Sequence, residues 1–194
     1  MVLTERFQRA FAHAANAHAC DVRKGTTIPY VSHLLAVASL VLENGGTEDE
    51  AIAALLHDAV EDQGGALRLE LIRAEFGETV AAIVDGCTDT YEDPKPAWEA
   101  RKKAYLAHLP TQSTSVRLVS AADKLHNARC ILADYRTEGE KLWGRFNAPR
   151  DRILWYYRSL VEAYREAGSN PVVEEFARVV EALDREVTEG LARA

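Results

Sequence analysis

The sequence predicts an all-α fold, organised as one compact helical bundle over residues 1–194. Apolar residues recur at the three- and four-residue spacing of amphipathic helices in almost every segment. No stretch of useful length alternates apolar and polar residues as a half-buried strand would, and no internal repeat or low-complexity segment is present. With 194 residues, of which 47% are hydrophobic, the chain is long enough to bury a sizeable core.

The first two helices are separated by a loop that holds Gly25 and Pro29. An amphipathic helix is expected over 3–19. Ser32 is the expected N-cap of the second helix, which runs to about Glu43 and is stopped by "NGG".

The third helix begins with a capping signal, because Thr47 is followed three residues later by Glu50. It runs through 51–62 ("AIAALLHDAVED") and stops at "QGG". "GEKLWGRFNAP" is expected to be an irregular connector near the C-terminal end of the bundle. The other expected helices span 66–75, 77–87, 97–108, 113–135, 150–167 and 171–191.

Composition and charge exclude several classes of partner. The net charge of −7 argues against duplex nucleic acid, whose binding proteins usually carry a basic balance or stripe. No apolar run approaches the roughly 18–20 residues of a membrane span, and the N-terminus does not resemble a secretory signal. Three widely separated cysteines argue against a disulfide framework, so a reducing, cytoplasmic location is expected.

Four ionisable residues crowd the end of the third predicted helix: His57, Asp58, Glu61 and Asp62. Residues four apart lie on one helix face, so these side chains should line one end of a single sector. Such a cluster is costly to desolvate without a partner, and imidazole and carboxylate groups are good ligands of divalent cations.

Further ligands for such an ion must come from other helices. His33 opens the second helix among apolar neighbours, and Asp123 lies with Asn127 on an apolar stripe of the long helix over 113–135. A carboxylate in an apolar stripe needs a counter-charge. His126, beside Asp123, is interpreted as a packing residue, with an outer-sphere role at the metal as the alternative. The competing interpretation of the whole cluster is a buried polar network that holds no metal.

These motifs together resemble the HD superfamily of metal-dependent phosphohydrolases. The resemblance is greatest to the guanosine tetraphosphate hydrolase domain of RelA/SpoT proteins and its small stand-alone relatives. The matching stretches are "VRKGTTIPYVSH", "AALLHDAVED", "FGETVAAIVDGCTD", "WEARKKAYL" and "AADKLHNAR", which span residues 22–129. Beyond about residue 150 the likeness is limited to further helix.

The resemblance implies one bound divalent metal ion, typically Mn²⁺. It implies that two acids, Glu61 and Asp62, position or deprotonate the attacking water. The implied metal ligands are His33, His57, Asp58 and Asp123. The implied substrate-binding residues are Arg23, Lys24, Tyr30, Lys102, Lys103 and Asn127.

The expected activity is removal of the 3′-pyrophosphate of (p)ppGpp or a related alarmone, giving GDP or GTP and pyrophosphate. One alternative is an HD-type nucleotidase acting on another nucleotide or phosphomonoester, and another is a helical sensor that binds a nucleotide without hydrolysing it. Leu34 follows His33 where the family commonly has proline, and Trp143 or Phe146 of the unaligned connector either shapes the pocket or packs against it. The sequence leaves open whether the protein is a monomer or a homo-oligomer.

Overall fold

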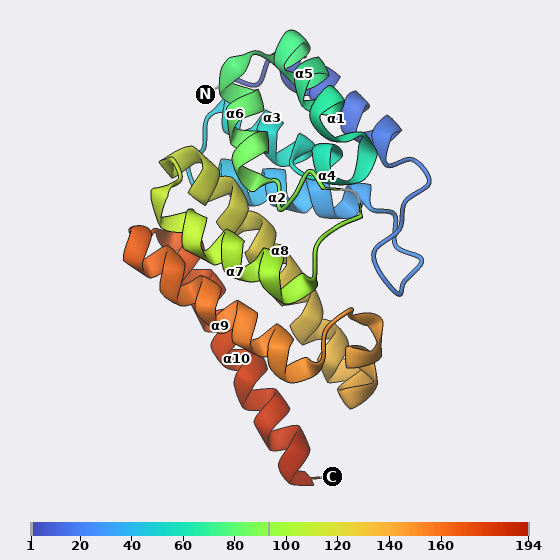
Figure 1. The fold of residues 1–194 in the computed structure, drawn as a ribbon, viewed down its shortest axis with the longest axis vertical. Helices are drawn as coiled ribbons and strands as arrows, with labels where there is room; N and C mark the ends of the chain where they lie inside the picture. The colour runs from blue at the N-terminus through green and yellow to red at the C-terminus, as the bar shows by residue number, and fades with distance from the viewer. Residues whose placement is uncertain (1, 93, 194) are drawn as a thin grey trace.

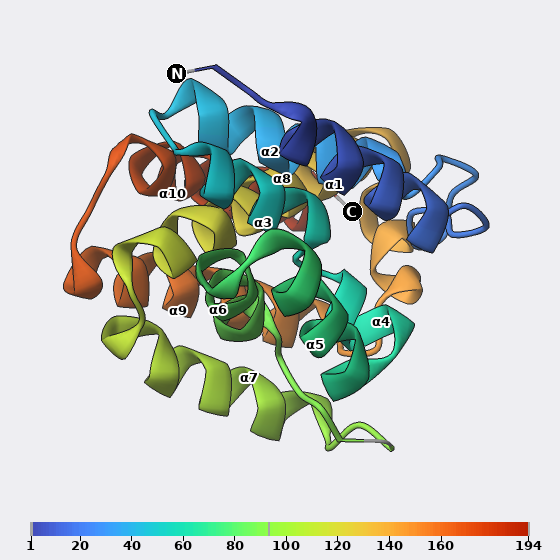
Figure 2. The same ribbon diagram turned by 90° about the horizontal axis from the view of Figure 1, so that it is seen from above.

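A long helix, α8 (Thr114–Glu138), runs through the middle of the molecule and organises the other helices around it. The computed structural model describes residues 2–92 and 94–193, apart from the side chains of residues 62–63 and 192–193. In this described part α8 packs against α2, α3 and α6 on one side and against α9 and α10 on the other (Figure 1, Figure 2). The prediction of an all-α fold is confirmed.

The remaining helices follow the expected order closely. Among the described residues, β-type pairing is limited to one isolated bridge, between Val22 and Pro29. The elements other than α8 are α1 (Glu5–Ala17), α2 (Val31–Glu43), α3 (Glu48–Leu56), α4 (Ala59–Gln63), α5 (Gly65–Phe76), α6 (Glu78–Cys87), α7 (Trp98–His108), the 3₁₀ segment η1 (Leu109–Thr111), the 3₁₀ segment η2 (Gly139–Arg145), α9 (Arg150–Ala167) and α10 (Pro171–Arg193).

Local capping explains where two of these helices begin. The predicted capping box of α3 is confirmed: Thr47 Oγ1 accepts from the Glu50 backbone N–H, and Glu50 Oε2 accepts from the Thr47 backbone N–H. The prediction that Ser32 caps α2 is wrong. Its N–H donates to the Pro29 carbonyl, so a backbone turn starts the helix one residue before Ser32.

The third predicted helix is divided in two, which corrects the expectation of one helix through residue 62. α3 ends at Leu56, His57 and Asp58 form a turn, and α4 begins at Ala59. The His57 ring Nδ1 lies 2.8 Å from the Ala54 carbonyl, which the Asp58 N–H would bond in a continuous α-helix. The His57 side chain therefore competes for the acceptor that the helix needs to continue.

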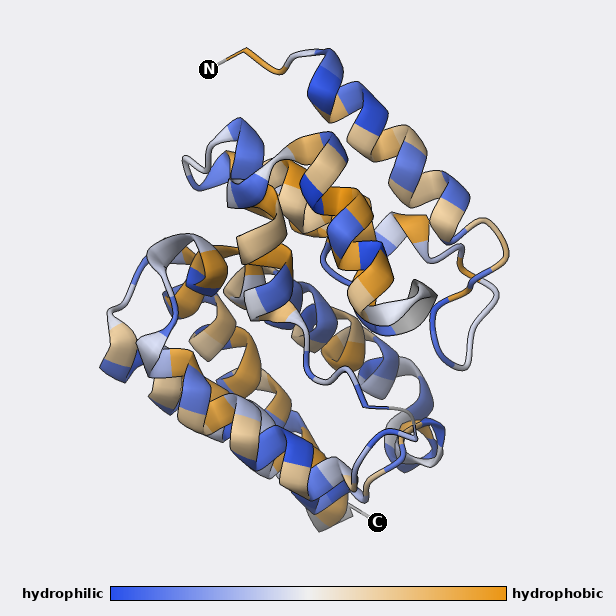
Figure 3. Ribbon diagram, turned by 45° about the horizontal axis from the view of Figure 1, so that its top comes forward, coloured by the Kyte–Doolittle hydropathy of each residue, from blue (hydrophilic) through white to orange (hydrophobic). Residues whose placement is uncertain are grey.

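The core lies where the apolar faces of the helices meet. Ala51–Leu56 of α3 are buried throughout, so this short helix is enclosed by its neighbours. Figure 3 shows the hydrophobic residues gathered toward the interior and the hydrophilic residues along the outer faces of helices such as α1 and α7. Within the described residues, no helix is long and apolar enough to cross a membrane.

Candidate active site

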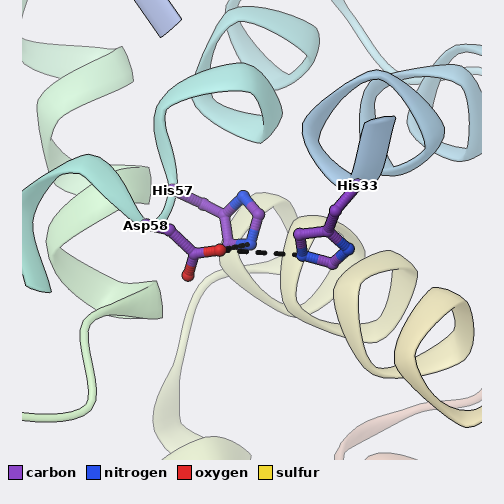
Figure 4. Close-up of side chains that lie close together, drawn as sticks. All are labelled: His33, His57 and Asp58. Atoms are coloured by element: carbon purple, nitrogen blue, oxygen red, sulfur yellow. Dashed lines mark ion pairs between the residues drawn. The ribbon is translucent and has the colours of Figure 1, made fainter. Parts of the chain in front are cut away.

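Two histidines and an aspartate converge where α2 meets the turn between α3 and α4 (Figure 4). His33, His57 and Asp58 each offer one ligand atom, and these atoms lie within 4.8 Å of one another. Asp58 Oδ2 is 3.0 Å from His57 Nε2 and 3.6 Å from His33 Nε2. Asp123 approaches from α8, with Oδ1 3.2 Å from His33 Nε2 and 3.8 Å from His57 Nε2. The structure thus brings together all four residues that were expected to hold a metal.

Each carboxylate of this cluster is held by at least one hydrogen bond from another side chain. The Tyr30 hydroxyl donates to Asp58 Oδ2 at 2.6 Å. The Asn127 amide donates to Asp123 Oδ1 at 2.5 Å, and the Lys124 ammonium donates to Asp123 Oδ2 at 2.6 Å. Tyr30 and Asn127, both expected to bind substrate, therefore also orient the carboxylates.

Burial and charge oppose one another in this cluster. Burial disfavours charge on the His57 imidazole, but Asp58 and Asp123 outweigh it, and the pKa of His57 lies well above its ordinary value. Burial would raise the pKa of Asp123, but Lys124 and the two histidines hold this pKa well below its usual range. The pKa of Asp58 is also lowered, because the charge of His57 overcomes the effect of burial. The site thus demands a positive charge between its two carboxylates.

The donor set fits a divalent cation. His57 Nδ1 is occupied by the Ala54 carbonyl, so Nε2 is the nitrogen left for a ligand, and this buried atom has no hydrogen-bond partner among the described residues. This nitrogen and the oxygens of the two carboxylates face the same small volume, where a proton on His57 or a metal cation offsets the negative charge. Imidazole nitrogen and carboxylate oxygen together suit Mn²⁺, Fe²⁺ and Zn²⁺.

A cavity of about 520 Å³ opens beside the cluster. Tyr30 and Asn127 belong to its wall, and both bond the carboxylates described above. Arg23 donates to Asn127 Oδ1 at 2.6 Å, and Lys24 donates to Asn147 Oδ1 at 2.9 Å. The wall therefore presents cations from the loop before α2 next to the cluster.

Comparison with known proteins identifies the family. The sequence profile of the HD domain family matches residues 10–154. The chain belongs to the HD domain family.

Relatives of this HD domain include enzymes named for alarmone hydrolysis. The guanosine-3′,5′-bis(diphosphate) 3′-pyrophosphohydrolase MESH1 of Xenopus tropicalis is 40% identical over 119 residues, which is 60% of this chain and 64% of that protein. The guanosine-3′,5′-bis(diphosphate) 3′-pyrophosphohydrolase of Aquifex aeolicus is 34% identical over 137 residues, 71% of this chain and 19% of that protein. The matched segments thus span less than two thirds of either relative.

A solved structure shares the fold of this HD domain along almost its whole length. It belongs to a metazoan ortholog of SpoT described as hydrolysing ppGpp and acting in starvation responses. The TM-score is 0.76 at 25% sequence identity, and the alignment covers 96% of this chain and 99% of that one.

The remaining predicted residues of this HD domain that the structure describes pair with side chains outside the cluster. Glu61 Oε1 accepts from Lys95 of the loop before α7 at 2.7 Å. The side chain of Asp62 is outside the described part of the structure. Lys102 pairs with Asp89 at 2.9 Å, and the exposed Lys103 pairs with Glu99 at 2.9 Å. These two lysines are thus paired on the α7 side of the molecule, and neither lines the cavity beside Tyr30.

Sequence reasoning missed two cations of this HD domain. Lys124 follows Asp123 directly in "AADKLHNAR", and its 17% exposed side chain is the counter-charge that Asp123 was expected to need. Arg145 lies in the connector that could not be aligned, and it lines the cavity while pairing with Asp134 and Glu138. The need of Asp123 for a counter-charge could have identified the adjacent Lys124. Nothing in the sequence near Arg145 indicates that it lines the cavity.

Proposed function

We propose that this HD domain is a metal-dependent pyrophosphohydrolase that removes the 3′-pyrophosphate of (p)ppGpp, giving GDP or GTP and pyrophosphate. One observation carries the proposal: a cluster of two buried histidines, the buried Asp123 and the half-buried Asp58 adjoins a cavity whose wall holds Arg23 and Lys24. The names of the curated relatives and the activity of the structural neighbour support ppGpp as the substrate.

The proposed metal ligands are His33, His57, Asp58 and Asp123, and the proposed ion is Mn²⁺. An ion held there supplies Lewis-acid polarisation of a phosphoryl oxygen and lowers the pKa of bound water. The chain's own contribution is to orient three of these ligands: His57 bonds the Ala54 carbonyl, Asp58 accepts from Tyr30, and Asp123 accepts from Asn127 and Lys124.

Binding of the pyrophosphate is assigned to the loop before α2. Arg23 lies at the junction of the cavity and the cluster through its bond to Asn127, and Lys24 lies on the cavity wall beside it. Guanidinium and ammonium groups there offset the charge of a polyphosphate and hold it next to the ligand cluster.

The rest of the cavity suits a nucleoside. Ile28, Leu142 and Phe146 add apolar surface to the wall, and Arg145 adds a further cation. Ligand sites of this size combine apolar lining with a few convergent polar groups. A base and pentose would therefore lie against η2 while the phosphates reach Arg23.

Glu61 and Asp62 stay the proposed acceptors of the proton from the attacking water. They follow Asp58 by three and four residues on α4, so they adjoin the cluster in the chain. A carboxylate beside a metal-activated water is a suitable general base.

We further propose that residues 1–194 act as a single domain in a reducing cytoplasm, in agreement with the three free cysteines.

The test is hydrolysis of ppGpp by the purified chain with Mn²⁺, with an EDTA control and separation of products by anion exchange. GDP and pyrophosphate should appear only with metal. Asp123→Asn should abolish turnover, whereas Asp151→Asn, whose carboxylate is 80% exposed and paired with the adjacent Arg150, should not change it. Unchanged ppGpp in protein shown to carry metal would refute this substrate, and orthophosphate as the product would indicate a nucleotidase.

A further inference from the structure

We propose that His126 is a positioning residue that fixes the tautomer and orientation of the metal ligand His33. The proposal rests on the metal use stated above and adds a residue to it. The observation is a direct contact: His33 Nδ1 lies 2.7 Å from His126 Nδ1, with the ring centroids 4.8 Å apart.

The tautomers follow from this distance. Two ring nitrogens at 2.7 Å share one proton, so one of them donates and the other accepts. His33 faces Asp58 and Asp123 with Nε2, and a neutral imidazole that ligates through Nε2 carries its proton on Nδ1. His126 Nδ1 is therefore the acceptor, and the proton of His126 lies on Nε2, which is 3.8 Å from Cys130 Sγ.

The two histidine ligands are consequently held in different ways. His57 is oriented by the Ala54 backbone carbonyl, which no substitution removes. His33 is oriented by a side chain, so a substitution of His126 can remove this acceptor, and the His33 side chain is itself only 1% exposed. Outer hydrogen-bond partners of metal-ligating histidines typically contribute about 10–100-fold to metal affinity.

His126 also belongs to the cavity wall, together with Asn127 and Cys130. His126 therefore contacts the proposed metal ligand His33 and also lines the proposed nucleotide cavity. A packing role alone would depend on the volume of the ring and not on which atom faces His33.

The test compares three substitutions that separate the acceptor from the volume. In His126→Asn the amide oxygen occupies about the position of Nδ1 and can accept from His33, whereas His126→Gln places its amide nearer the position of Nε2. His126→Ala removes both. Metal affinity is measured by calorimetric titration of the metal-free protein with Mn²⁺, after circular dichroism has shown that each variant is folded.

The expected pattern is near-normal affinity for His126→Asn and an affinity about 10–100-fold lower for His126→Gln and His126→Ala. Thr137→Ala is the control, because Thr137 lies on the exposed side of the same helix, bonds the Ala133 carbonyl and should leave affinity unchanged. Wild-type affinity in all three variants would overturn the proposal, and so would an Asn variant as weak as the Ala variant. So would wild-type protein with no metal affinity. The readout needs no nucleotide, so normal metal binding without ppGpp hydrolysis would refute the proposed substrate alone.

Discussion

Asp123 accepts a hydrogen bond on each carboxylate oxygen, from Asn127 on one and Lys124 on the other. Its side chain is 9% exposed and that of Lys124 is 17% exposed. The ammonium also lies 5.2 Å from the centre of the Tyr105 ring. Removing one partner of such a pair leaves the other charge buried and uncompensated, which costs more than the pair contributes.

Lys124→Met should lower the free energy of unfolding by about 2 kcal/mol in EDTA, because it keeps the side-chain volume and deletes the counter-charge. Saturating Mn²⁺ should recover part of this loss by supplying a positive charge on the same carboxylate. Urea unfolding with and without Mn²⁺ measures both effects. Lys103→Met is the control: its side chain is 62% exposed, and the change should stay within about 0.5 kcal/mol. Equal losses in the two variants would contradict the argument.

The sequence identified those site residues whose ionisable side chains lie on apolar helix faces. His33 and Asp123 stood out because ionisable groups on apolar stripes require a counter-charge, and the structure brings them together with His57 and Asp58. The expectation that Lys102 and Lys103 meet the phosphates stays a prediction; in the structure they pair with Asp89 and Glu99. Charge on a polar helix face does not reveal which acid will neutralise it.

The geometry of the loop between α1 and α2 depends on one glycine, Gly25. Gly25 has φ of +72°, and a Cβ added there would lie 2.6 Å from Arg145 Cδ. Both the left-handed backbone and the close side chain exclude a larger residue. Since Arg23 and Lys24 precede Gly25, their positions depend on this packing against η2.

Gly25→Ala should therefore raise KM for ppGpp several-fold and lower stability by about 1–2 kcal/mol. Gly45→Ala provides the matched control, because Gly45 has φ of +80° but open space around the added Cβ. Gly45→Ala should lower stability and leave KM unchanged. Steady-state kinetics combined with thermal unfolding separates the two effects, and an unchanged KM in Gly25→Ala would show that the loop does not depend on Arg145.

The capping box of α3 should contribute measurably to the fold, because α3 leads into His57. Thr47→Ala should lower the free energy of unfolding by about 1 kcal/mol through loss of the bond to the Glu50 N–H. Thr137→Ala, on the exposed side of α8 where Thr137 bonds only the Ala133 carbonyl of its own helix, should have little effect or a small stabilising one. Denaturant titration of both variants decides the comparison; a loss of similar size in Thr137→Ala would exclude capping as the cause.

Most helices were predictable because periodicity and capping residues act locally. The break after α3 was not, since it depends on the His57 ring reaching the Ala54 carbonyl. The periodicity of a sequence reports only the polarity of its side chains. It does not distinguish a histidine that bonds the backbone of its own helix from one that does not. The turn changes which side chains share a face: Asp58 is placed beside His57, and Glu61 is placed beside Lys95.

At the scale of the whole molecule, the metal-free protein should be most stable near pH 6.5. The raised pKa of His57 contributes stability that is present below about pH 6.5 and is lost as pH rises through the folded value. Burial lowers the pKa of His33, and it lowers that of His126 to about 4, so these groups cost stability as pH falls below about 6.5. The lowered pKa values of Asp58 and Asp123 add a loss only at more acidic pH.

Unfolding in EDTA from pH 5 to 9 should therefore show a maximum near neutrality and a decline at higher pH. Mn²⁺ should remove the decline, because the ion takes the place of the proton on the imidazole; at 100 times its dissociation constant it stabilises by about 2.7 kcal/mol. A stability in EDTA that stays constant from pH 6 to 9 would contradict this account.

The arrangement of α8 has a consequence for how this protein can change. One rigid helix carries Asp123 and Asn127 at the ligand cluster and continues past Ile131 to Asp134 along the cavity. Much of the remaining wall comes from the loop before α2 and from η2, both outside the ligand set. The prediction of an irregular connector was wrong for Gly139–Arg145, which form the 3₁₀ segment η2. Most of the surface proposed to contact the nucleoside therefore lies outside the segments that carry the proposed metal ligands. Exchanging residues 139–149 should alter the nucleoside preference of the proposed activity and leave the proposed metal ligands unchanged, which makes this segment the starting point for redesigning substrate range.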